Sequence, residues 1–299
     1  MKRNPNKIRR RADEKALHVI SVVLITIFTL MCLYPFWNVF INSIATKEEA
    51  ARGVYFFPEE PTFSVYADVL RDGKLLHSLL ISVARTVLST VGCVLFSAMF
   101  AYLMTQQNLP CRKVIYRFAI ITMYVGGGLI PWYMVITQYL GMRDTMWALI
   151  VPSLLSSYNI LLMRNFIKQC VPNEVVESAR IDGAGDLRIF VQIVLRLATP
   201  ALATIGLFIA LGKWNDWYSS MLFIKTESKH TLQYYLYRMV NMSNAIKSMQ
   251  QAGVSTDVKL PSETLKMAMA IVATGPVVLV YPFVQRYFVK GLTVGAVKG

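Results

Sequence analysis

The amino-acid sequence predicts an all-α polytopic membrane protein with about six transmembrane helices. Of its 299 residues, 55% are hydrophobic and only 16% are charged, whereas a soluble domain carries about 25% charged residues. The apolar residues form long uncharged runs, and a run of about 18 residues suffices to cross a bilayer as a helix. The predicted spans cover residues 17–41, 76–104, 115–138, 145–165, 197–222 and 265–287.

Both ends of the chain are expected in the cytoplasm, because Lys and Arg concentrate in the segments that this topology places inside. We expect a basic N-terminal tail over 1–16, one membrane domain over 17–290 and a short C-terminal tail over 291–299. The first apolar run is far longer than the core of a signal peptide, which favours an uncleaved span. We therefore interpret the basic residues behind the net charge of +14 as the ones that orient the chain in the lipid bilayer, and no nucleic-acid partner is expected.

Three spans contain residues that are unusual in hydrocarbon. In span two, Arg85 is expected either to reach outward to the membrane surface or to face a wet cavity. Span three contains "YVGGGLIPW" (124–132), which loosens a helix for close packing or for substrate contact. Span five contains "GKWNDWY" (212–218), in which Lys213 and Asp216 can neutralise each other or the aromatic residues can anchor a helix end. After it, residues 231–240 predict a short amphipathic helix.

The sequence shows no arrangement typical of catalysis or of cofactor binding. Its three histidines lie far apart, and its four cysteines form no CxxC pair. The nearest approach to a phosphate-binding loop, Gly206 to Lys213, has one residue too many and places Trp where a hydroxyl residue is needed. We therefore expect a non-catalytic chain that binds no cofactor and takes its energy from another subunit or from an ion gradient.

The loop over 170–196 is markedly polar and lies inside the cell in this topology. Asn173 is a good N-cap residue, and Gly183 supplies a left-handed position that ends a helix over 174–182. At 100° per residue this helix is apolar on two sides, with Ile181 opposite three other apolar residues, Val175, Val176 and Ala179. Such a helix suits a position between this chain and a soluble partner, and the alternative is a peripheral helix lying on lipid.

The same loop resembles the cytoplasmic "EAA" loop of ABC-importer permease subunits, whose pattern is E-A-A-x3-G-x9-I-x-L-P. Ser178 replaces the middle Ala of that pattern and Arg196 replaces its Pro, which leaves Pro200 to supply the bend before span five. The positions that match it are Glu177, Ala179, Gly183, Ile193 and Leu195.

Other motifs are similar to those of the maltose-type carbohydrate-uptake permeases, namely "RIDGAG", "WND" and "YFVKGLTVGAVKG". Two more, "MYVGGGLIPWY" and "LGMRDTMWALIVP", resemble the branch that handles complex or acidic oligosaccharides. The resemblance implies the type I ABC importer permease fold and a place in the bacterial inner membrane. It also implies a second homologous permease subunit, two ATPase subunits that use ATP and Mg, and an extracytoplasmic solute-binding protein.

The resemblance further implies that the helix over 174–182 docks on the ATPase. The coupling residues expected from it are Glu174, Val175, Val176, Glu177, Ala179, Arg180, Asp182 and Gly183.

Substrate-path candidates follow from sugar chemistry, because aromatic rings stack on sugar faces and Asn or Asp bind hydroxyl groups. They are Tyr124, Asn159, Trp214, Asn215 and Asp216. The alternative function is a stand-alone ion-coupled secondary transporter, which needs ionisable groups for ion relay inside the spans. Only Asp216 meets that requirement, which counts against the alternative.

Overall fold

The computed structural model describes residues 12–71, 73–106, 109–252 and 262–296. Every regular element within these residues is a helix, which confirms the predicted all-α class. Residues 1–11 of the predicted N-terminal tail and 297–299 of the predicted C-terminal tail lie outside the described residues.

The chain divides into two compact units, and each is described on its own. The first consists of Met1–Val69 with Lys259–Ile271, and the second of Leu70–Val258 with Val272–Gly299.

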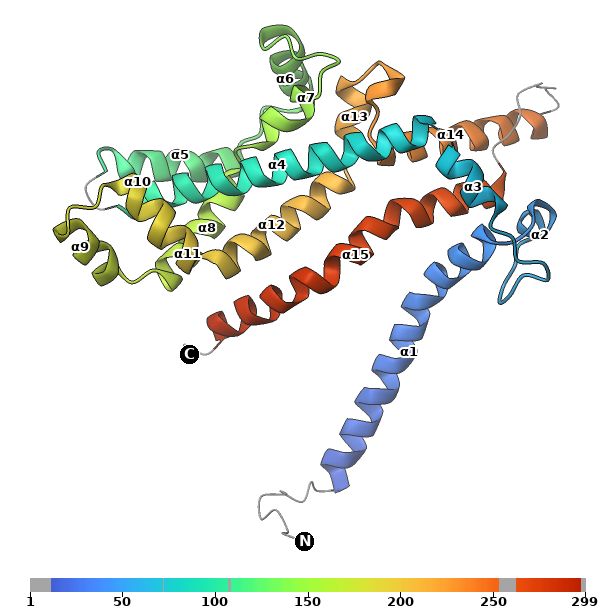
Figure 1. Cartoon of the computed structure of the whole chain (residues 1–299), viewed down its shortest axis with the longest axis horizontal. Helices are drawn as coiled ribbons and strands as arrows, with labels where there is room; N and C mark the ends of the chain where they lie inside the picture. The colour runs from blue at the N-terminus through green and yellow to red at the C-terminus, as the bar shows by residue number, and fades with distance from the viewer. Residues whose placement is uncertain (1–11, 72, 107–108, 253–261, 297–299) are drawn as a thin grey trace. The chain divides into compact units, whose positions relative to one another are not determined.

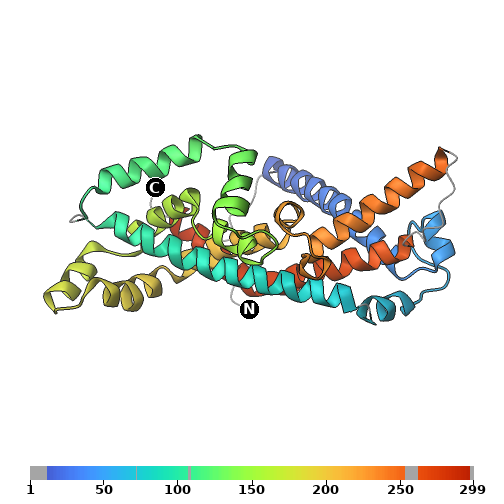
Figure 2. The same cartoon turned by 90° about the horizontal axis from the view of Figure 1, so that it is seen from above.

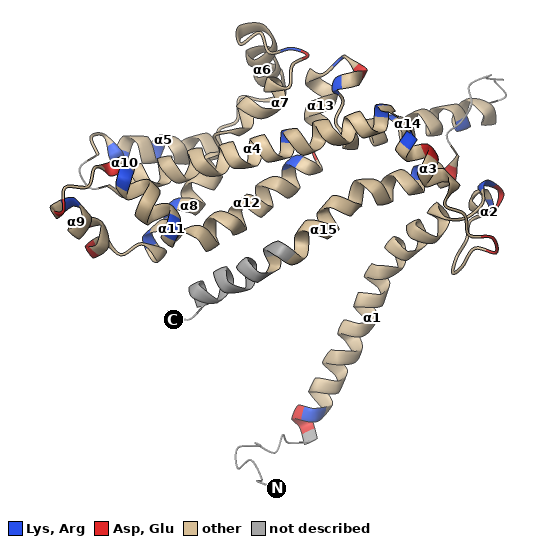
Figure 3. Cartoon of the chain, in the orientation of Figure 1, with Lys and Arg blue, Asp and Glu red and all other residues tan. Residues whose placement is uncertain are grey.

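The first unit contains α1 (Ala12–Ser43), α2 (Lys47–Arg52), most of α3 (Ser64–Arg71) and the first turns of α15 (Glu263–Ala296). Apolar side chains are exposed along most of α1, and Figure 3 shows charge only at its N-terminal end. At 1.5 Å per residue α1 is about 48 Å long, which is enough to cross a bilayer. Its last turn is buried, and the Asn42 side chain holds the following loop through two hydrogen bonds with the backbone of Val54.

The second unit is built around α4 (Gly73–Thr105), which packs against α12 (Thr199–Trp214) and α8 (Ser157–Cys170). Figures 1 and 2 both show α4 running alongside α12. The buried apolar side chains between these helices form the core of this unit, and they include Cys93, Ala98, Tyr102, Met163, Ile167, Ile205 and Ile209.

Three described helices are long and apolar enough to cross a membrane unbroken, and they cover Asp13–Ser43, Gly73–Thr105 and Glu263–Pro282. Three further candidates are pairs of helices bent at a short break, by 114°, 47° and 79°. If each bent pair is one span, the described residues contain up to six, the number predicted from the sequence.

Predicted span three is two helices rather than one loosened helix. α5 (Arg112–Tyr124) ends before the glycines, and α6 (Leu129–Met134) with the π-helical turn Val135–Tyr139 follows at 114°. Gly128 has φ +82° at the N-cap of α6, a conformation that favours glycine. Pro131 lies in the first turn of α6, where backbone N–H groups have no partner within the helix, so the missing N–H of proline costs no hydrogen bond.

Predicted spans four and five are also interrupted. Span four consists of α7 (Trp147–Ile150), the 3₁₀ turn Val151–Ser153 and α8, which continues beyond the predicted end at 165 to Cys170. In span five, α12 ends at Trp214, and α13 (Tyr218–Phe223) begins after three residues that are not helical.

The bend before α12 lies where the sequence places it. α11 (Leu195–Leu197) ends just before Ala198, and the chain turns there by 79° into α12. Pro200 is the second residue of α12, where the helix requires no backbone N–H, so it fits the bend without a lost hydrogen bond. Arg196 lies inside α11 and is not at the bend.

The helix predicted over 231–240 is longer in the structure. α14 (Leu232–Gln251) extends eleven residues beyond the predicted end at 240. Residues 253–261 lie outside the described residues.

Candidate functional site

The first candidate site is the helix of the predicted coupling loop, α9 (Asn173–Ile181). It begins one residue before the predicted start, so Pro172 rather than Asn173 occupies the N-cap position. Its end confirms the prediction, because Gly183 has φ +81° and follows the C-cap residue Asp182. The N–H groups of Gly183 and Ala184 donate to the carbonyls of Arg180 and Ala179 at 3.0 and 2.9 Å, which is the Schellman arrangement.

The two sides of α9 have different surroundings. Val176 and Ala179 pack against the core of the second unit, next to Ala184 from the turn after the helix. Ile181 is 87% exposed, which agrees with its predicted place on the opposite side. Val175 is predicted to share the side of Val176 and Ala179, but it is 39% exposed. α9 therefore buries one narrow apolar side and presents Ile181 outward.

Polar contacts tie α9 to the end of α4. Arg180 Nη2 donates to Gln106 Oε1 at 2.5 Å and to Asp186 Oδ1, on α10 (Asp186–Ile189), at 2.9 Å. Tyr102 Oη donates to the same Asp186 oxygen at 3.5 Å. The hydrogen bond that Arg180 donates to Asp186 is the main cause of a raised pKa of Arg180.

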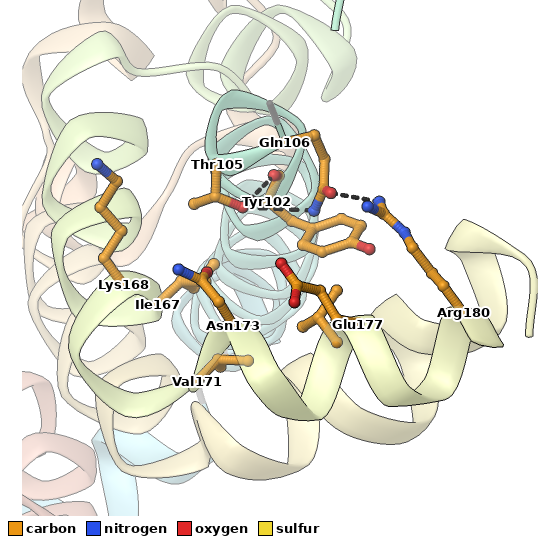
Figure 4. A pocket seen from close by; sticks show the side chains of 10 residues that line it. Tyr102, Thr105, Gln106, Ile167, Lys168, Val171, Asn173, Glu177 and Arg180 are labelled. Atoms are coloured by element: carbon orange, nitrogen blue, oxygen red, sulfur yellow. Dashed lines mark hydrogen bonds between the residues drawn. The ribbon is translucent and has the colours of Figure 1, made fainter. Parts of the chain in front are cut away.

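A pocket of about 170 Å³ lies between α9 and the ends of α4 and α8. Figure 4 shows Glu177 projecting from α9 toward Tyr102, and the pocket also includes Asn173 and Lys168 in its lining.

The second candidate site is a buried ion pair between α4 and the break after α12. Arg85 is only 1% exposed, its Nη1 donates to the backbone carbonyl of Asp216 at 2.8 Å, and its Nη2 forms an ion pair with the Asp216 carboxylate. The backbone N–H and hydroxyl of Ser219 also donate to that carboxylate, at 3.0 and 2.7 Å.

Two expectations for these residues were wrong. Arg85 neither reaches the membrane surface nor faces an open cavity, because the carboxylate of Asp216 provides a buried counter-charge. Asp216 is neutralised by Arg85 rather than by Lys213, although Lys213 lies on the same helix end. The partner is 131 residues away in sequence, so no local pattern indicates it.

The predicted substrate-path residues are in different environments. Trp214 is buried and its Nε1 donates to the carbonyl of Ala273 at 2.9 Å, which gives it a packing role. Asn215 is exposed beside it, and Tyr124 is 83% exposed at the end of α5. Asn159 is half-buried near the start of α8 and donates to Cys93 Sγ at 3.6 Å.

The sequence reading missed a cluster around Asp144. Its carboxylate accepts hydrogen bonds from the backbone N–H groups of Lys225 and Thr226, both at 3.0 Å, and from the Thr226 hydroxyl at 2.6 Å. Lys229 Nζ adds an ion pair at 3.2 Å. The Thr226 hydroxyl is the largest cause of a strongly lowered pKa of Asp144. The only local signal in the sequence is Asp144 itself, beside Arg143 in a short loop. Its φ is +59°, a left-handed conformation that Asp and Asn tolerate better than most residues.

Comparison with known proteins identifies the class of protein that these features define. Residues 9–294 match the family model described as "binding-protein-dependent transport system inner membrane component". The chain therefore belongs to this family of membrane-embedded permease subunits, which confirms the resemblance seen in the sequence.

Two relatives are similar over nearly the whole chain. The polygalacturonan/rhamnogalacturonan transport system permease protein YtcP of Bacillus subtilis (strain 168) is 37% identical over 274 residues, 91% of this chain and 94% of that protein. A bacterial ABC transporter involved in the import of the acidic polysaccharide alginate has a chain that is 30% identical, with a TM-score of 0.83 over 93% of this chain and 99% of that one.

A bacterial alginate ABC transporter solved with an alginate pentasaccharide-bound periplasmic protein matches with a TM-score of 0.54. It is 12% identical and covers 91% of this chain and 93% of that one, so it supports the fold alone.

Proposed function

We propose that this chain is the permease subunit of an ATP-driven importer that carries an oligosaccharide across a bacterial inner membrane, with both termini in the cytoplasm. The family and the relatives named for polygalacturonan and alginate transport support this proposal. The working complex contains a second homologous permease subunit, two ATPase subunits and an extracytoplasmic solute-binding protein. ATP and Mg bind to the ATPase subunits, and this chain binds no cofactor.

The observation that carries the proposal is α9, a short helix fixed on one side and open on the other. Its inner side packs on the core through Val176 and Ala179, and a glycine-ended turn fixes its C-terminus. Ile181 is left outside, although exposing a large apolar side chain to water is unfavourable by about 2 kcal/mol. We assign Ile181 and the exposed acidic residues Glu174 and Asp182 to the surface that docks on the ATPase.

Movement of α9 reaches the membrane helices through two connections. Arg180 and Asp186 link α9 and α10 to Tyr102 and Gln106 at the end of α4. The chain also continues from α10 through the π-helical turn Phe190–Val194 and α11 into α12. In this proposal, closure of the ATPase subunits on ATP displaces α9 and with it α4 and α12.

The alternative, a stand-alone ion-coupled transporter, is weakened by the pairing of Asp216. A carboxylate that relays ions must be free to exchange its partner, whereas Asp216 accepts from Arg85 and twice from Ser219. The alternative requires uptake driven by an ion gradient in vesicles that contain no ATPase subunit.

The decisive experiment changes Ile181 in the complex reconstituted in proteoliposomes. Ile181→Glu should reduce oligosaccharide uptake by about tenfold or more, because a charge replaces an apolar contact at the interface. It should reduce the stimulation of ATP hydrolysis by the oligosaccharide to a similar extent. Ile181→Leu is the matched control and should retain both activities. Unchanged thermal stability of the Glu variant excludes misfolding as the cause, and full coupled activity of that variant would remove α9 from the proposed interface.

A further inference from the structure

The charges around Arg85 do not balance. Arg85 and Asp216 neutralise each other, but Lys213 lies on the last turn of α12 and adds a second cation. All three residues fall within predicted spans two and five. The cluster therefore carries a net charge of +1 at a depth where an uncompensated charge is unfavourable by several kcal/mol.

Lys213 has the surroundings of a binding group rather than of a solvated surface lysine. It lies one turn after the buried Ile209, on the side of α12 that packs toward α4, and is itself only partly exposed. It stands three residues before Asp216, which Arg85 of α4 contacts just after the end of α12. Cys93 of α4 belongs to the same buried cluster as Ile209 and accepts a hydrogen bond from Asn159 of α8.

Asp216 cannot fully compensate Lys213, because its oxygens are already engaged. Arg85 and both donors of Ser219 use the Asp216 carboxylate. The adjoining residues Gly212 and Asn215 are exposed, so this end of α12 is accessible to a ligand.

We propose that Lys213 binds a carboxylate of the transported oligosaccharide, which makes this chain selective for glycans that contain uronic acid. In this proposal Asn215 and Asn159 bind hydroxyl groups of the same sugar chain. The inference rests on the proposed function as an oligosaccharide permease. It fits the names of two similar proteins, which transport polygalacturonan or the acidic polysaccharide alginate.

The first test compares acidic and neutral ligands in the complete complex, reconstituted in proteoliposomes with ATP. The ligands are trigalacturonate and galactotriose, its counterpart without carboxylates, each supplied with binding protein whose loading is verified by fluorescence titration. Lys213→Met should lower trigalacturonate uptake by about tenfold or more, as expected for one charge-assisted contact, while galactotriose uptake changes little. Lys213→Arg is the matched control and should retain trigalacturonate uptake, because it keeps the charge.

A second test does not depend on how the binding protein selects its ligand. A carbodiimide activates a carboxyl group, and the Lys213 amine then forms an amide with it while the carbodiimide leaves as a urea. During turnover with trigalacturonate, mass spectrometry should find the sugar attached to Lys213 in the unmodified chain and no such adduct in Lys213→Arg.

The proposal would be overturned if Lys213→Met reduced the uptake of both sugars equally, or if it left trigalacturonate uptake unchanged. A crosslink from Lys213 to an acidic peptide of the second permease subunit would overturn it as well. Dependence of uptake on anionic phospholipid rather than on the sugar's carboxylates would indicate a lipid phosphate and would also overturn it. Failure of the proposed function is distinct, because the unmodified complex would then transport neither sugar with ATP.

Discussion

Replacement of Asp216 by Asn tests the buried ion pair directly. Asn has nearly the same shape and can still accept a hydrogen bond, so the change removes the charge and little else. Arg85, which is 1% exposed, keeps the backbone carbonyl of residue 216 as an acceptor but loses its counter-charge. The cluster then contains two cations, Arg85 and Lys213, and no anion.

The magnitude follows from the asymmetry of the site. Breaking a buried pair so that one charge stays uncompensated reduces stability by about 3–5 kcal/mol. Arg85→Leu should be milder, about 1–2 kcal/mol, because Asp216 keeps two donors from Ser219, is 21% exposed and gains Lys213 as a possible partner. The double variant should lose less than the sum of the single changes, since neither charge is then left alone.

The assay is the melting temperature of the purified complex, followed together with the amount of chain inserted in the membrane. A loss of 3–5 kcal/mol corresponds to a decrease on the order of 10 °C. Lys225→Gln, which removes a charge outside this cluster, serves as the control for a general effect of net charge. Equal effects of the two single changes, or strict additivity in the double variant, would refute the idea that Arg85 depends on Asp216.

Two further predictions concern the loop contacts. Asp144→Asn should increase hydrogen exchange at the Lys225 and Thr226 amides by about tenfold, because both donate to the charged carboxylate. Since the pKa of Asp144 is lowered in the folded chain, this protection should persist above the ordinary carboxyl pKa and be lost only as pH falls through the lowered value. Gly183→Ala should decrease stability by about 1 kcal/mol in the same melting assay, from the left-handed conformation alone, because its Cβ would meet nothing within 4 Å. Full stability of Gly183→Ala, or unchanged exchange in Asp144→Asn, would contradict these assignments.

Features that depend on local sequence were predictable. The long apolar runs indicated helices of membrane-spanning length, and α1, α4 and α15 are such helices. Gly183 indicated the end of α9 because a left-handed residue after a helix is a property of the glycine itself. Pro200 likewise indicated a bend, since proline fits only the first turn of the helix that follows.

Features that depend on contacts between distant segments were not predictable. Arg85 and Asp216 lie on different helices, and local spacing suggested Lys213 as the partner because it is three residues from Asp216. Asp144 binds a segment more than eighty residues away for which periodicity carries no signal. Trp214 was chosen for its sugar-stacking chemistry, but its indole is buried and bonded to Ala273, which only packing can reveal.

The same two helices, α4 and α12, connect the two candidate sites. α4 contains Tyr102, which contacts Asp186 beside α9, and Arg85, which pairs with Asp216; these residues are separated by about 25 Å along the helix. α12 begins at the bend that follows the coupling loop and ends about 24 Å further on at Trp214, between Lys213 and Asp216.

Because α4 and α12 pack closely along their length, neither can shift far without the other. A displacement of α9 therefore has to move both helices nearly as rigid bodies, and it reaches Lys213 from two directions. Weakening the Arg85–Asp216 pair should therefore reduce the stimulation of ATP hydrolysis by acidic substrate, even when the complex still assembles. A defect confined to Lys213 should leave the stimulation by neutral sugar intact.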